Sequence, residues 1–255
     1  MSPISPIRTA MILAAGLGTR MRLAEDAPPK PLTVIAGRTL LDRMLDRLKD
    51  AGIRRVVVNV HFKAALLEAH LAASTHGLEV VISDERDGLM ETGGGVVQAR
   101  SLLGDAPFMV CNADILWQET DNNLQNLLDV FDADKMDACL LLANRERCTG
   151  YDGRGDFHIA VNPDSPAGRL SRRDDIEKTA TAPVVYAPFV YAGVQIVNPA
   201  LLEGAPEGPF SFNVLWDKAL AERRLYGVEL SGTWMHVGTP EGLAAAEKRL
   251  AENRA

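Results

Sequence analysis

The chain has 255 residues, of which 27 are Lys or Arg and 34 are Asp or Glu, so its formal net charge is −7. Hydrophobic residues make up 47% and charged residues 24%, the proportions of an ordinary globular protein, which exclude a disordered, collagen-like or coiled-coil chain. This acidity also predicts no nucleic-acid partner and no anionic membrane partner, because both are polyanions, although a small anion can still bind in a locally basic pocket.

The first half of the chain alternates strand-like and helix-like segments. The apolar run at 9–15 ends at Gly16 and is typical of a strand buried on both faces. Leucine and methionine recur at helical spacing over 40–48, and Gly52 follows where a helix C-terminus favours glycine. Further strands are expected at 55–60, 78–83, 108–112 and 137–143, and further helices at 63–73, 94–103 and 123–131. Because helices separate the strands, we predict an α/β fold with a Rossmann-like, mostly parallel sheet flanked by helices.

The second half changes character. Residues 145–182 are rich in Gly, Asp, Arg and Pro, and the strands expected there are short. Strands are also expected at 184–197 and 233–237, and helices at 212–222 and 241–253. Thr239 is expected to cap the last helix, with Pro240 at its first helical position. No repeat or low-complexity linker interrupts the sequence, so we expect a single domain over residues 1–255.

Three cysteines, Cys111, Cys139 and Cys148, form neither a CxxC pair nor an even set, which predicts free thiols in a reducing compartment. The apolar stretch at 10–15 is shorter than the apolar region of a signal peptide, and Arg20 follows it closely. No run approaches the roughly 18–20 apolar residues that span a bilayer. We therefore expect a cytoplasmic protein without a membrane segment.

The segment 16–22, Gly-Leu-Gly-Thr-Arg-Met-Arg, directly follows the first predicted strand. Backbone N–H groups at the carboxyl end of a parallel strand can face an anion, and glycine lets the backbone come close to a phosphate. Arg20 and Arg22 add permanent positive charge. Met21 replaces the third glycine of GxGxxG, and no Gly-Lys-Ser/Thr of a Walker A loop follows. The segment predicts a phosphate-binding turn, and an ordinary turn with solvated arginines is the alternative.

Lys30 stands in the sequence Pro28-Pro29-Lys30-Pro31. The flanking prolines restrain the backbone on both sides of the lysine. Such restraint is unusual for a surface lysine and suits an ammonium group that has to reach a fixed target. The sequence therefore predicts a functional role for Lys30.

Residues 14–22, followed by Pro29-Lys30-Pro31-Leu32, closely resemble the signature of sugar-1-phosphate nucleotidyltransferases. Four further segments resemble motifs of this family, in the family's order: 91–95, 112–114, 191–194 and 234–240. In the family these are a second Gly-rich loop that contacts the base, a metal-binding aspartate after a strand, a sugar-side strand and a closing motif. The resemblance covers most of the chain. Within the family the sequence looks most like the N-acetylmuramate-1-phosphate uridylyltransferases, and short mannose-1-phosphate guanylyltransferases are near neighbours.

The resemblance implies a nucleotide-diphospho-sugar transferase fold, with a nucleotide-binding half at about 1–115 and a sugar-binding and closing half at about 116–255. It also implies transfer of a nucleotidyl group from a nucleoside triphosphate, UTP being favoured, to a sugar 1-phosphate with release of pyrophosphate. The assembly implied is a monomer or a small homo-oligomer.

Three groups of site residues follow from the resemblance. Arg20, Lys30 and Asp114 are implied as catalytic: Arg20 attracts the leaving phosphates, Lys30 stabilises charge on the α-phosphoryl group, and Asp114 holds Mg²⁺. The implied nucleotide-binding residues are Leu13, Ala14, Ala15, Gly16, Gly18, Thr19, Arg20, Lys30, Glu91, Thr92, Gly93 and Gly94. The implied sugar-phosphate-binding residues are Asn112, Tyr191 and Gly193. No general base is needed, because a phosphate oxygen is already anionic at neutral pH.

The sequence departs from the family pattern at three places. Leu23 and Glu25 stand where the family loop usually continues with Pro and Thr, and Ala113 replaces the glycine before the metal-binding aspartate. His236 stands where the family places its second metal-binding aspartate. Imidazole suits Zn²⁺, Mn²⁺ or Co²⁺ better than Mg²⁺. His236 therefore ligates a softer metal, contacts a phosphate or a metal-bound water beside Asp114, or marks a weakened site; we favour the second interpretation.

Other polar and aromatic residues carry weaker signals. Arg169, Arg172, Arg173 and Lys178 form a basic group that either holds the sugar phosphate or is a solvated loop. Asn59 and His61 end a predicted strand on the ligand side, where a structural role is at least as well supported as binding. Trp117 and Trp216 lie near apolar runs and are expected in the core.

The resemblance implies a metal-dependent enzyme that makes UDP-N-acetylmuramate from UTP and N-acetylmuramate 1-phosphate in peptidoglycan recycling. Mannose-1-phosphate guanylyltransferase or glucose-1-phosphate thymidylyltransferase activity is the alternative within the family. A non-catalytic nucleotide-sugar sensor or regulatory subunit is the alternative of another class, and His236 motivates it.

Overall fold

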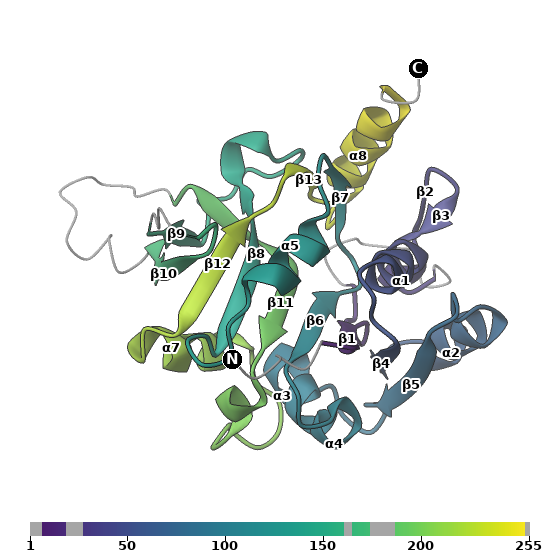
Figure 1. The fold of residues 1–255 in the computed structure, drawn as a ribbon. Helices are drawn as coiled ribbons and strands as arrows, with labels where there is room; N and C mark the ends of the chain where they lie inside the picture. Colours follow the sequence, from purple (N-terminus) through teal and green to yellow (C-terminus); the bar gives the residue numbers. More distant parts are fainter. Residues whose placement is uncertain (1–6, 19–27, 161–164, 174–186, 253–255) are drawn as a thin grey trace. The chain divides into compact units, whose positions relative to one another are not determined.

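The computed structural model describes residues 7–18, 28–160, 165–173 and 187–252 (Figure 1). The chain forms two compact units: the first contains residues 1–114 and 196–215, and the second contains 115–195 and 216–255. Residues 196–215, expected in the second half of the chain, therefore cluster with the first unit. The single domain with two functional halves remains a prediction.

The first unit is built on four parallel strands in the order β5-β4-β1-β6. Their bounds are β1 Thr9–Leu13, β4 Arg55–Val60, β5 Glu79–Asp84 and β6 Phe108–Asn112. Leu13 at the end of β1 lies opposite Asn59 of β4 and opposite Asn112 of β6. The carboxyl ends of these three strands therefore lie at the same level of the sheet, which is the edge where α/β sheets bind ligands.

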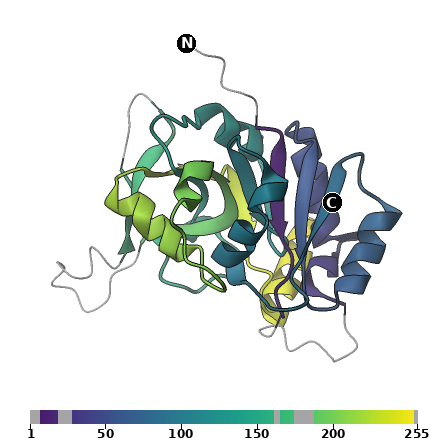
Figure 2. The ribbon, with the colours of Figure 1, turned by 90° about the horizontal axis from the view of Figure 1, so that it is seen from below.

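Helices flank the strands of the first unit in both views (Figures 1 and 2). The helices, 3₁₀ helices and a small hairpin of this unit are η2 Lys30–Leu32, β2 Val34–Ile35, β3 Arg38–Thr39, α1 Leu40–Asp50, α2 Ala64–Ala73, α3 Glu91–Gln98, α4 Arg100–Leu103 and η4 Pro199–Leu202. Thr39 caps α1, because its hydroxyl accepts a hydrogen bond from the Asp42 N–H at 3.0 Å. Gly52 follows α1 with a φ of 85°, as the predicted C-terminal glycine requires.

The second unit has two groups of paired strands. In one, β12 pairs with β8 in parallel and with β10 in antiparallel, and β9 pairs antiparallel with β10 and β11. In the other, β7 and β13 form an antiparallel pair. The bounds are β7 Leu116–Glu119, α5 Asn123–Val130, β8 Ala138–Asn144, η3 Arg145–Arg147, β9 Phe157–Ile159, β10 Gly168–Arg172, β11 Phe189–Val197, α7 Asn213–Ala221, β12 Leu225–Glu229, β13 Gly232–Met235 and α8 Pro240–Glu252. β11 and α7 each cross the boundary between the units.

The predicted fold class, an α/β fold with a mostly parallel sheet flanked by helices, is confirmed. The predicted N-terminal cap of α8 is confirmed too. The hydroxyl of Thr239 accepts a hydrogen bond from the Gly242 N–H at 3.1 Å, as Thr39 does for α1. The helix expected at 94–103 begins earlier, at Glu91, and is divided at Ala99 into α3 and α4. The first turn of this helix was not predicted, because it contains three consecutive glycines and glycine is a poor helix former.

Burial follows the predicted core. Trp117 and Trp216 are buried, as expected, and so are Cys111 and Cys139. All three cysteines are free thiols. Among the helices that the structure describes, none combines the length and the apolar character needed to cross a membrane.

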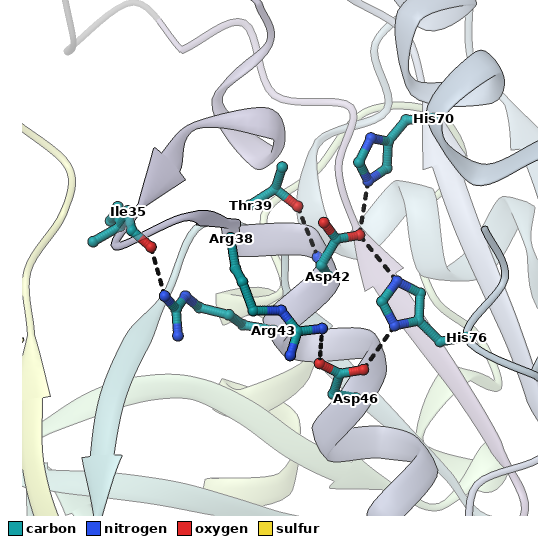
Figure 3. A network of polar contacts seen from close by, with 8 residues as sticks. All are labelled: Ile35, Arg38, Thr39, Asp42, Arg43, Asp46, His70 and His76. Carbon is teal, nitrogen blue, oxygen red and sulfur yellow. Dashed lines mark hydrogen bonds and ion pairs between the residues drawn. The ribbon is translucent and has the colours of Figure 1, made fainter. Parts of the chain in front are cut away.

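A cluster of two aspartates and two histidines ties α1 to its neighbours in the first unit (Figure 3). Asp42 and Asp46 lie on α1, His70 lies on α2, and His76 lies in the loop before β5. One oxygen of Asp42 lies 2.7 Å from His70 Nε2 and 3.0 Å from His76 Nε2. His76 Nδ1 lies 2.7 Å from Asp46, which also pairs with Arg38. His76 therefore bridges two carboxyl groups of the same helix through its two ring nitrogens.

The cluster favours the charged form of its central carboxylate. Burial by itself raises the pKa of Asp42, but hydrogen bonds from Thr39, His70 and His76 and the charge of His70 outweigh it, so the pKa lies below its ordinary value of 3.8. A carboxyl group whose pKa is lowered by folding stabilises the folded state above its unfolded pKa. This contribution is lost as the pH falls through the folded pKa.

We expect Asp42→Asn to lower the free energy of unfolding by about 1–3 kcal/mol at neutral pH, because it weakens charged hydrogen bonds to two histidines. The difference from the wild type should shrink as the pH falls below the ordinary aspartate pKa of 3.8. Urea denaturation at neutral pH and at a series of acidic pH values measures both effects. Asp50→Asn, at an exposed position of the same helix, is the control; a difference that does not change with pH would contradict the prediction.

Candidate functional site

A lysine–aspartate pair occupies the carboxyl edge of the first unit's sheet. Lys30 Nζ donates a hydrogen bond to Asp114 Oδ2 at 2.6 Å, and the two side chains are 9% and 33% exposed. Lys30 opens η2 between Pro29 and Pro31, and Asp114 follows the end of β6 by two residues. The lysine between the two prolines is therefore paired with the carboxylate predicted to bind the metal, and its action on a phosphoryl group stays a prediction.

The first Gly-rich turn begins at Gly16, shortly after the end of β1, and its Gly18 lies close to this lysine. Gly18 has a φ of 65°, and a Cβ placed on it would lie 3.8 Å from the Cβ of Lys30. This φ lies in the left-handed region that glycine adopts readily. Gly16 has open space around it. Thr19 and Arg20, both predicted to bind the nucleotide, lie outside the described residues, so their roles remain predictions.

Ala14 and Ala15 precede the turn, and their backbone N–H groups are already used. The N–H of Ala14 donates to Asn59 Oδ1 at 2.6 Å, and that of Ala15 donates to the same oxygen at 3.3 Å. This explains why the strand expected at 9–15 ends at Leu13: the next two amides bond to a side chain instead of a neighbouring strand. Any contact of these two alanines with a ligand has to come from their carbonyl groups or side chains, and the anion-binding amides have to come from Gly16 onward.

The second Gly-rich loop forms the first turn of α3. Glu91 and Thr92 are exposed, whereas Gly93 and Gly94 are buried. Glu91 has a φ of 58°, a conformation that a residue with a side chain adopts at a cost of about 1–3 kcal/mol and that is concentrated at functional sites. The exposed, strained start of the helix is therefore the part of this loop best placed for a ligand.

The buried glycines of this loop serve packing. The N–H groups of Gly93 and Gly94 donate to the Phe210 carbonyl at 2.9 and 3.1 Å, and the Thr92 hydroxyl accepts from the Phe212 N–H at 2.9 Å. A Cβ on Gly93 would collide with the Phe210 ring, and a Cβ on Gly94 would collide with the Gly208 carbonyl oxygen. The resemblance implied that both glycines bind the nucleotide. Their amides hold the segment around Phe210, and their contact with the nucleotide stays a prediction.

A buried carboxyl group that the sequence analysis did not single out lies behind both loops. Glu85 is 2% exposed, accepts from Asn59 Nδ2 at 2.7 Å and accepts from the Met90 N–H at 3.2 Å. Asn59, for which binding and structural roles were both open, is also 2% exposed and makes structural contacts. Residues 84–86 are Asp-Glu-Arg, and three charged residues in a row are typical of a solvated turn. The sequence therefore offered no reason to expect a buried Glu85.

Asn112 completes the edge formed by the first unit. It is the last residue of β6 and is half-buried. The next residue, Ala113, donates its N–H to the Leu13 carbonyl at 3.1 Å, which continues the parallel pairing and carries Asp114 into place. Leu13, Asn112, Asp114 and Lys30 are therefore brought together at one end of the sheet.

The predicted sugar-side residues lie in the second unit. Tyr191 donates its backbone N–H to Asp156 at 2.9 Å, and its ring packs edge-on against Trp216 at a centroid distance of 4.8 Å. Burial raises the pKa of Asp156, and the hydrogen bond from Tyr191 and the nearby arginines only partly oppose this. Gly193, two residues along β11, has a φ of 90°. Their sugar-binding role stays a prediction.

His236 lies in an aromatic environment of the second unit. Its ring lies 6.4 Å from Tyr151 and 5.9 Å from Trp234 between centroids, and a Cβ on Gly238 would lie 2.7 Å from ring atoms of His236. Its backbone N–H donates to the Thr149 carbonyl at 2.9 Å. No group of three or more His, Cys, Asp or Glu side chains suited to a metal occurs within the ranges that the structure describes. The chemistry of His236 remains open among the three predicted interpretations.

The basic group of the second unit is already engaged by protein atoms. Arg172 pairs with Asp217 at 2.7 Å and lies over the rings of Phe157 and Trp216. Arg173 donates to the Gly155 carbonyl at 2.5 Å. Lys178 falls outside the described parts of the chain. These contacts show how the two arginines are held, and a sugar-phosphate role for them remains a hypothesis.

Comparison with known families and proteins agrees with the resemblance found in the sequence. Residues 10–223 match the family model described as the MobA-like NTP transferase domain. The chain is 43% identical to the N-acetylmuramate alpha-1-phosphate uridylyltransferase of Caulobacter vibrioides over 249 residues, which cover 96% of this chain and 98% of that protein. It is 32% identical to the protein of the same name from Neisseria meningitidis, with 90% and 93% covered.

More distant similarities concern longer proteins or the fold alone. The chain is 29% identical to the mannose-1-phosphate guanylyltransferase catalytic subunit beta of Danio rerio, of which it spans 61%. A solved structure of UDP-glucose pyrophosphorylase complexed with UDP-glucose superposes with a TM-score of 0.77 at 16% identity, covering 97% of this chain and 99% of that one. Similarity at this level of identity shows a shared fold.

We expect Gly93→Ala to lower the free energy of unfolding by about 1–3 kcal/mol, because the added methyl group overpacks the contact with Phe210. Combining it with Phe210→Leu should recover part of the loss, since the ring that blocks the methyl group is removed. Gly94→Ala should not be rescued by the same change, because its obstacle is a backbone carbonyl. Urea denaturation of the single and double variants, with Phe210→Leu alone as reference, measures this; equal rescue of both glycine variants would contradict the packing account.

Proposed function

The chain belongs to the family of MobA-like NTP transferase domains, and on that premise we propose that it transfers a uridylyl group from UTP to N-acetylmuramate 1-phosphate. The products are UDP-N-acetylmuramate and pyrophosphate. The observation that carries this proposal is the Lys30–Asp114 pair beneath the Gly-rich turn. The 43% identity to an N-acetylmuramate alpha-1-phosphate uridylyltransferase over nearly the full length of both chains supports the choice of substrates.

The proposed reaction needs charge neutralisation and alignment more than covalent chemistry. A phosphate oxygen of the sugar phosphate attacks the α-phosphorus of UTP, and the bond from that phosphorus to the oxygen bridging to the β-phosphate breaks as pyrophosphate leaves. Both reactants are anions, so the protein has to bring like charges together and hold them in line. No proton has to be removed from the attacking oxygen.

Lys30 is proposed to stabilise the negative charge that develops on the α-phosphoryl group. Its ammonium group carries three protons, and one hydrogen bond goes to Asp114, so two more can be donated. The low exposure of the lysine strengthens its electrostatic effect, because water screens it poorly. The amides of Gly16 and Gly18 are proposed to bind the triphosphate together with Thr19, and Arg20 is proposed to attract the phosphates that leave.

The base and sugar contacts complete the proposal. Leu13, Ala14, Ala15, Glu91, Thr92, Gly93 and Gly94 are proposed to surround the nucleotide, with the buried glycines acting through the shape of the loop. Asn112, Tyr191 and Gly193 are proposed to contact the sugar phosphate. Residues 1–115 and 116–255 are proposed to act as halves of one domain. The free thiols of all three cysteines support the proposal of a reducing, cytoplasmic setting, and a monomer or small homo-oligomer is proposed for the assembly.

A divalent metal ion is generally used by nucleotidyltransferases of this family, and we propose Mg²⁺ for this chain. The residues of the first unit fit it: Mg²⁺ is commonly bound by one or two carboxylates plus substrate phosphates and several waters. Asp114 offers a partly exposed carboxylate whose Oδ2 bonds to Lys30. When bound, the ion would neutralise phosphate charge. His236 is proposed to contact a phosphate or a metal-bound water, and activity with Mn²⁺ would be compatible with its imidazole.

We expect pyrophosphate release with UTP and N-acetylmuramate 1-phosphate in the presence of Mg²⁺, and little with other pairs. The measurement is a grid of four nucleoside triphosphates against N-acetylmuramate, mannose and glucose 1-phosphates. Release with GTP and mannose 1-phosphate, or with dTTP and glucose 1-phosphate, would keep the reaction type and overturn the substrates. Silence across the grid, repeated with Mn²⁺ and Zn²⁺, would favour a non-catalytic sensor.

We expect Lys30→Met to lower kcat about 10²–10³-fold, the usual effect of removing one charge-stabilising donor from an active site. Lys30→Arg keeps the charge and should retain more activity than Lys30→Met. Lys135→Met is the matched control, because Lys135 pairs with Asp132 at 2.7 Å on the surface, where its side chain is 70% exposed. Steady-state kinetics with UTP measures the effect, and equal losses in Lys30→Met and Lys135→Met would contradict the assigned role.

A further inference from the structure

Two buried polar side chains connect the two Gly-rich loops of the first unit. Asn59 lies one residue before the end of β4, and Glu85 directly follows β5. Each is 2% exposed. Polar groups at this depth are costly unless hydrogen bonds replace the water they lose, so their partners show what they hold in place.

The hydrogen bonds of this pair form a continuous chain. It links the backbone just before the first Gly-rich loop to the backbone just before the second. Asn59 Oδ1 accepts from the N–H groups of Ala14 and Ala15, at 2.6 and 3.3 Å. Asn59 Nδ2 donates to Glu85 Oε1 at 2.7 Å. Glu85 Oε2 accepts from the Met90 N–H at 3.2 Å. Both oxygens of the carboxyl group and both ends of the amide are therefore used.

The backbone of Glu85 is itself held firmly. Its N–H donates to the Val60 carbonyl at 2.9 Å, and its carbonyl lies 2.7 Å from His61 Nδ1. The carboxyl group thus has little freedom to follow a moving loop. Its position determines where the Met90 amide, and with it the strained Glu91, is placed.

The third glycine of the second loop is shaped to this pair. A Cβ on Gly95 would lie 2.7 Å from Glu85 Oε1 and 3.1 Å from Asn59 Nδ2. Any side chain at this position would push into the hydrogen bond that joins the two residues. The glycine run 93–95 therefore accommodates a ring, a backbone carbonyl and a buried polar pair in turn.

We infer that Asn59 and Glu85 are positioning residues for the nucleotide, an inference that rests on the proposed function. They fix the position of the backbone at 14–15 relative to the backbone at 90–91. The two loops that follow these segments therefore present a preformed site for the base. Neither side chain needs to touch the ligand. Loss of the connection should weaken nucleotide binding and leave sugar-phosphate binding largely unchanged.

Reversing the polarity of the Asn59–Glu85 hydrogen bond tests this inference. Asn59→Asp keeps the acceptor for Ala14 and Ala15 but replaces the donor toward Glu85 by a second carboxyl group. Glu85→Gln replaces one of the two carboxyl oxygens by an NH₂ group. The single remaining oxygen can then accept from Asn59 or from Met90, but not from both. In the double variant the new glutamine can donate to the new aspartate and still accept from Met90, so all hydrogen bonds are restored.

We expect each single variant to raise the KM for UTP at least about tenfold, the scale of losing one buried hydrogen bond to a charged group. The KM for the sugar 1-phosphate should change less than about threefold. The double variant should return the KM for UTP to within about threefold of the wild type, because its hydrogen bonds are complete.

Asn123→Asp is the matched control, since Asn123 is 1% exposed and also bridges two segments by its side chain. Its amide donates to the Ser231 carbonyl at 3.0 Å and accepts from the Ser231 N–H at 2.7 Å, in the second unit. It should lower the melting temperature without raising the KM for UTP. This separates weakened nucleotide binding from a general loss of stability.

The possible outcomes distinguish the inference from the function on which it rests. If the wild type is active and the single variants lower only the melting temperature, with an unchanged KM for UTP, the inference is wrong. It is also wrong if the double variant is no better than the single ones. If the wild type releases no pyrophosphate with any pair and calorimetric titration shows no UTP binding, the proposed function itself fails, and the inference fails with it.

Discussion

Leu13 lies opposite Asn59 on one side and opposite Asn112 on the other, and the rest of the site depends on this parallel register. Because strands β1, β4 and β6 end at the same level, the segments that follow them meet at one edge of the sheet. The Gly-rich turn follows β1, the buried amide lies on β4, and Asp114 follows β6. A shift of one strand by a single residue would exchange the two faces of its side chains and separate these groups.

Much of this arrangement was predictable because it is local. The strands at 55–60 and 108–112 agree with β4 and β6 at both ends, since continuous apolar runs are typical of strands buried on both faces. Lys30 was singled out by its flanking prolines, which act on its own backbone. The burial of Glu85, in contrast, depends on its contact with Asn59 of β4, 26 residues earlier in the chain, which local sequence does not reveal. The strands β7 and β12 were missed because neither is a continuous apolar run: β7 ends in Gln118 and Glu119, and β12 contains Gly227 and ends in Glu229.

The glycines show why the same residue type has different roles in neighbouring loops. Gly18 adopts a left-handed conformation next to Lys30. A backbone without a side chain can approach a ligand closely at this point. Gly93, Gly94 and Gly95 instead make room for Phe210, Gly208 and Glu85. Three glycines of a motif that resembles a binding loop therefore also meet packing requirements within the chain. The sequence pattern could not separate these roles, because both require the absence of a Cβ atom.

The Lys30–Asp114 pair is difficult to explain by stability alone. Removing two charges from water costs free energy that their mutual attraction rarely exceeds, and a buried ion pair is commonly no more stabilising than apolar residues of the same size. Lys30 is 9% exposed, so this cost applies to it in particular. The surface pair between Lys135 and Asp132 has a similar distance, but its lysine is 70% exposed and keeps most of its hydration. A desolvated ammonium beside a partly exposed carboxylate suits an electrostatic task, and the proposed transfer of a nucleotidyl group between two anions is a task of that kind.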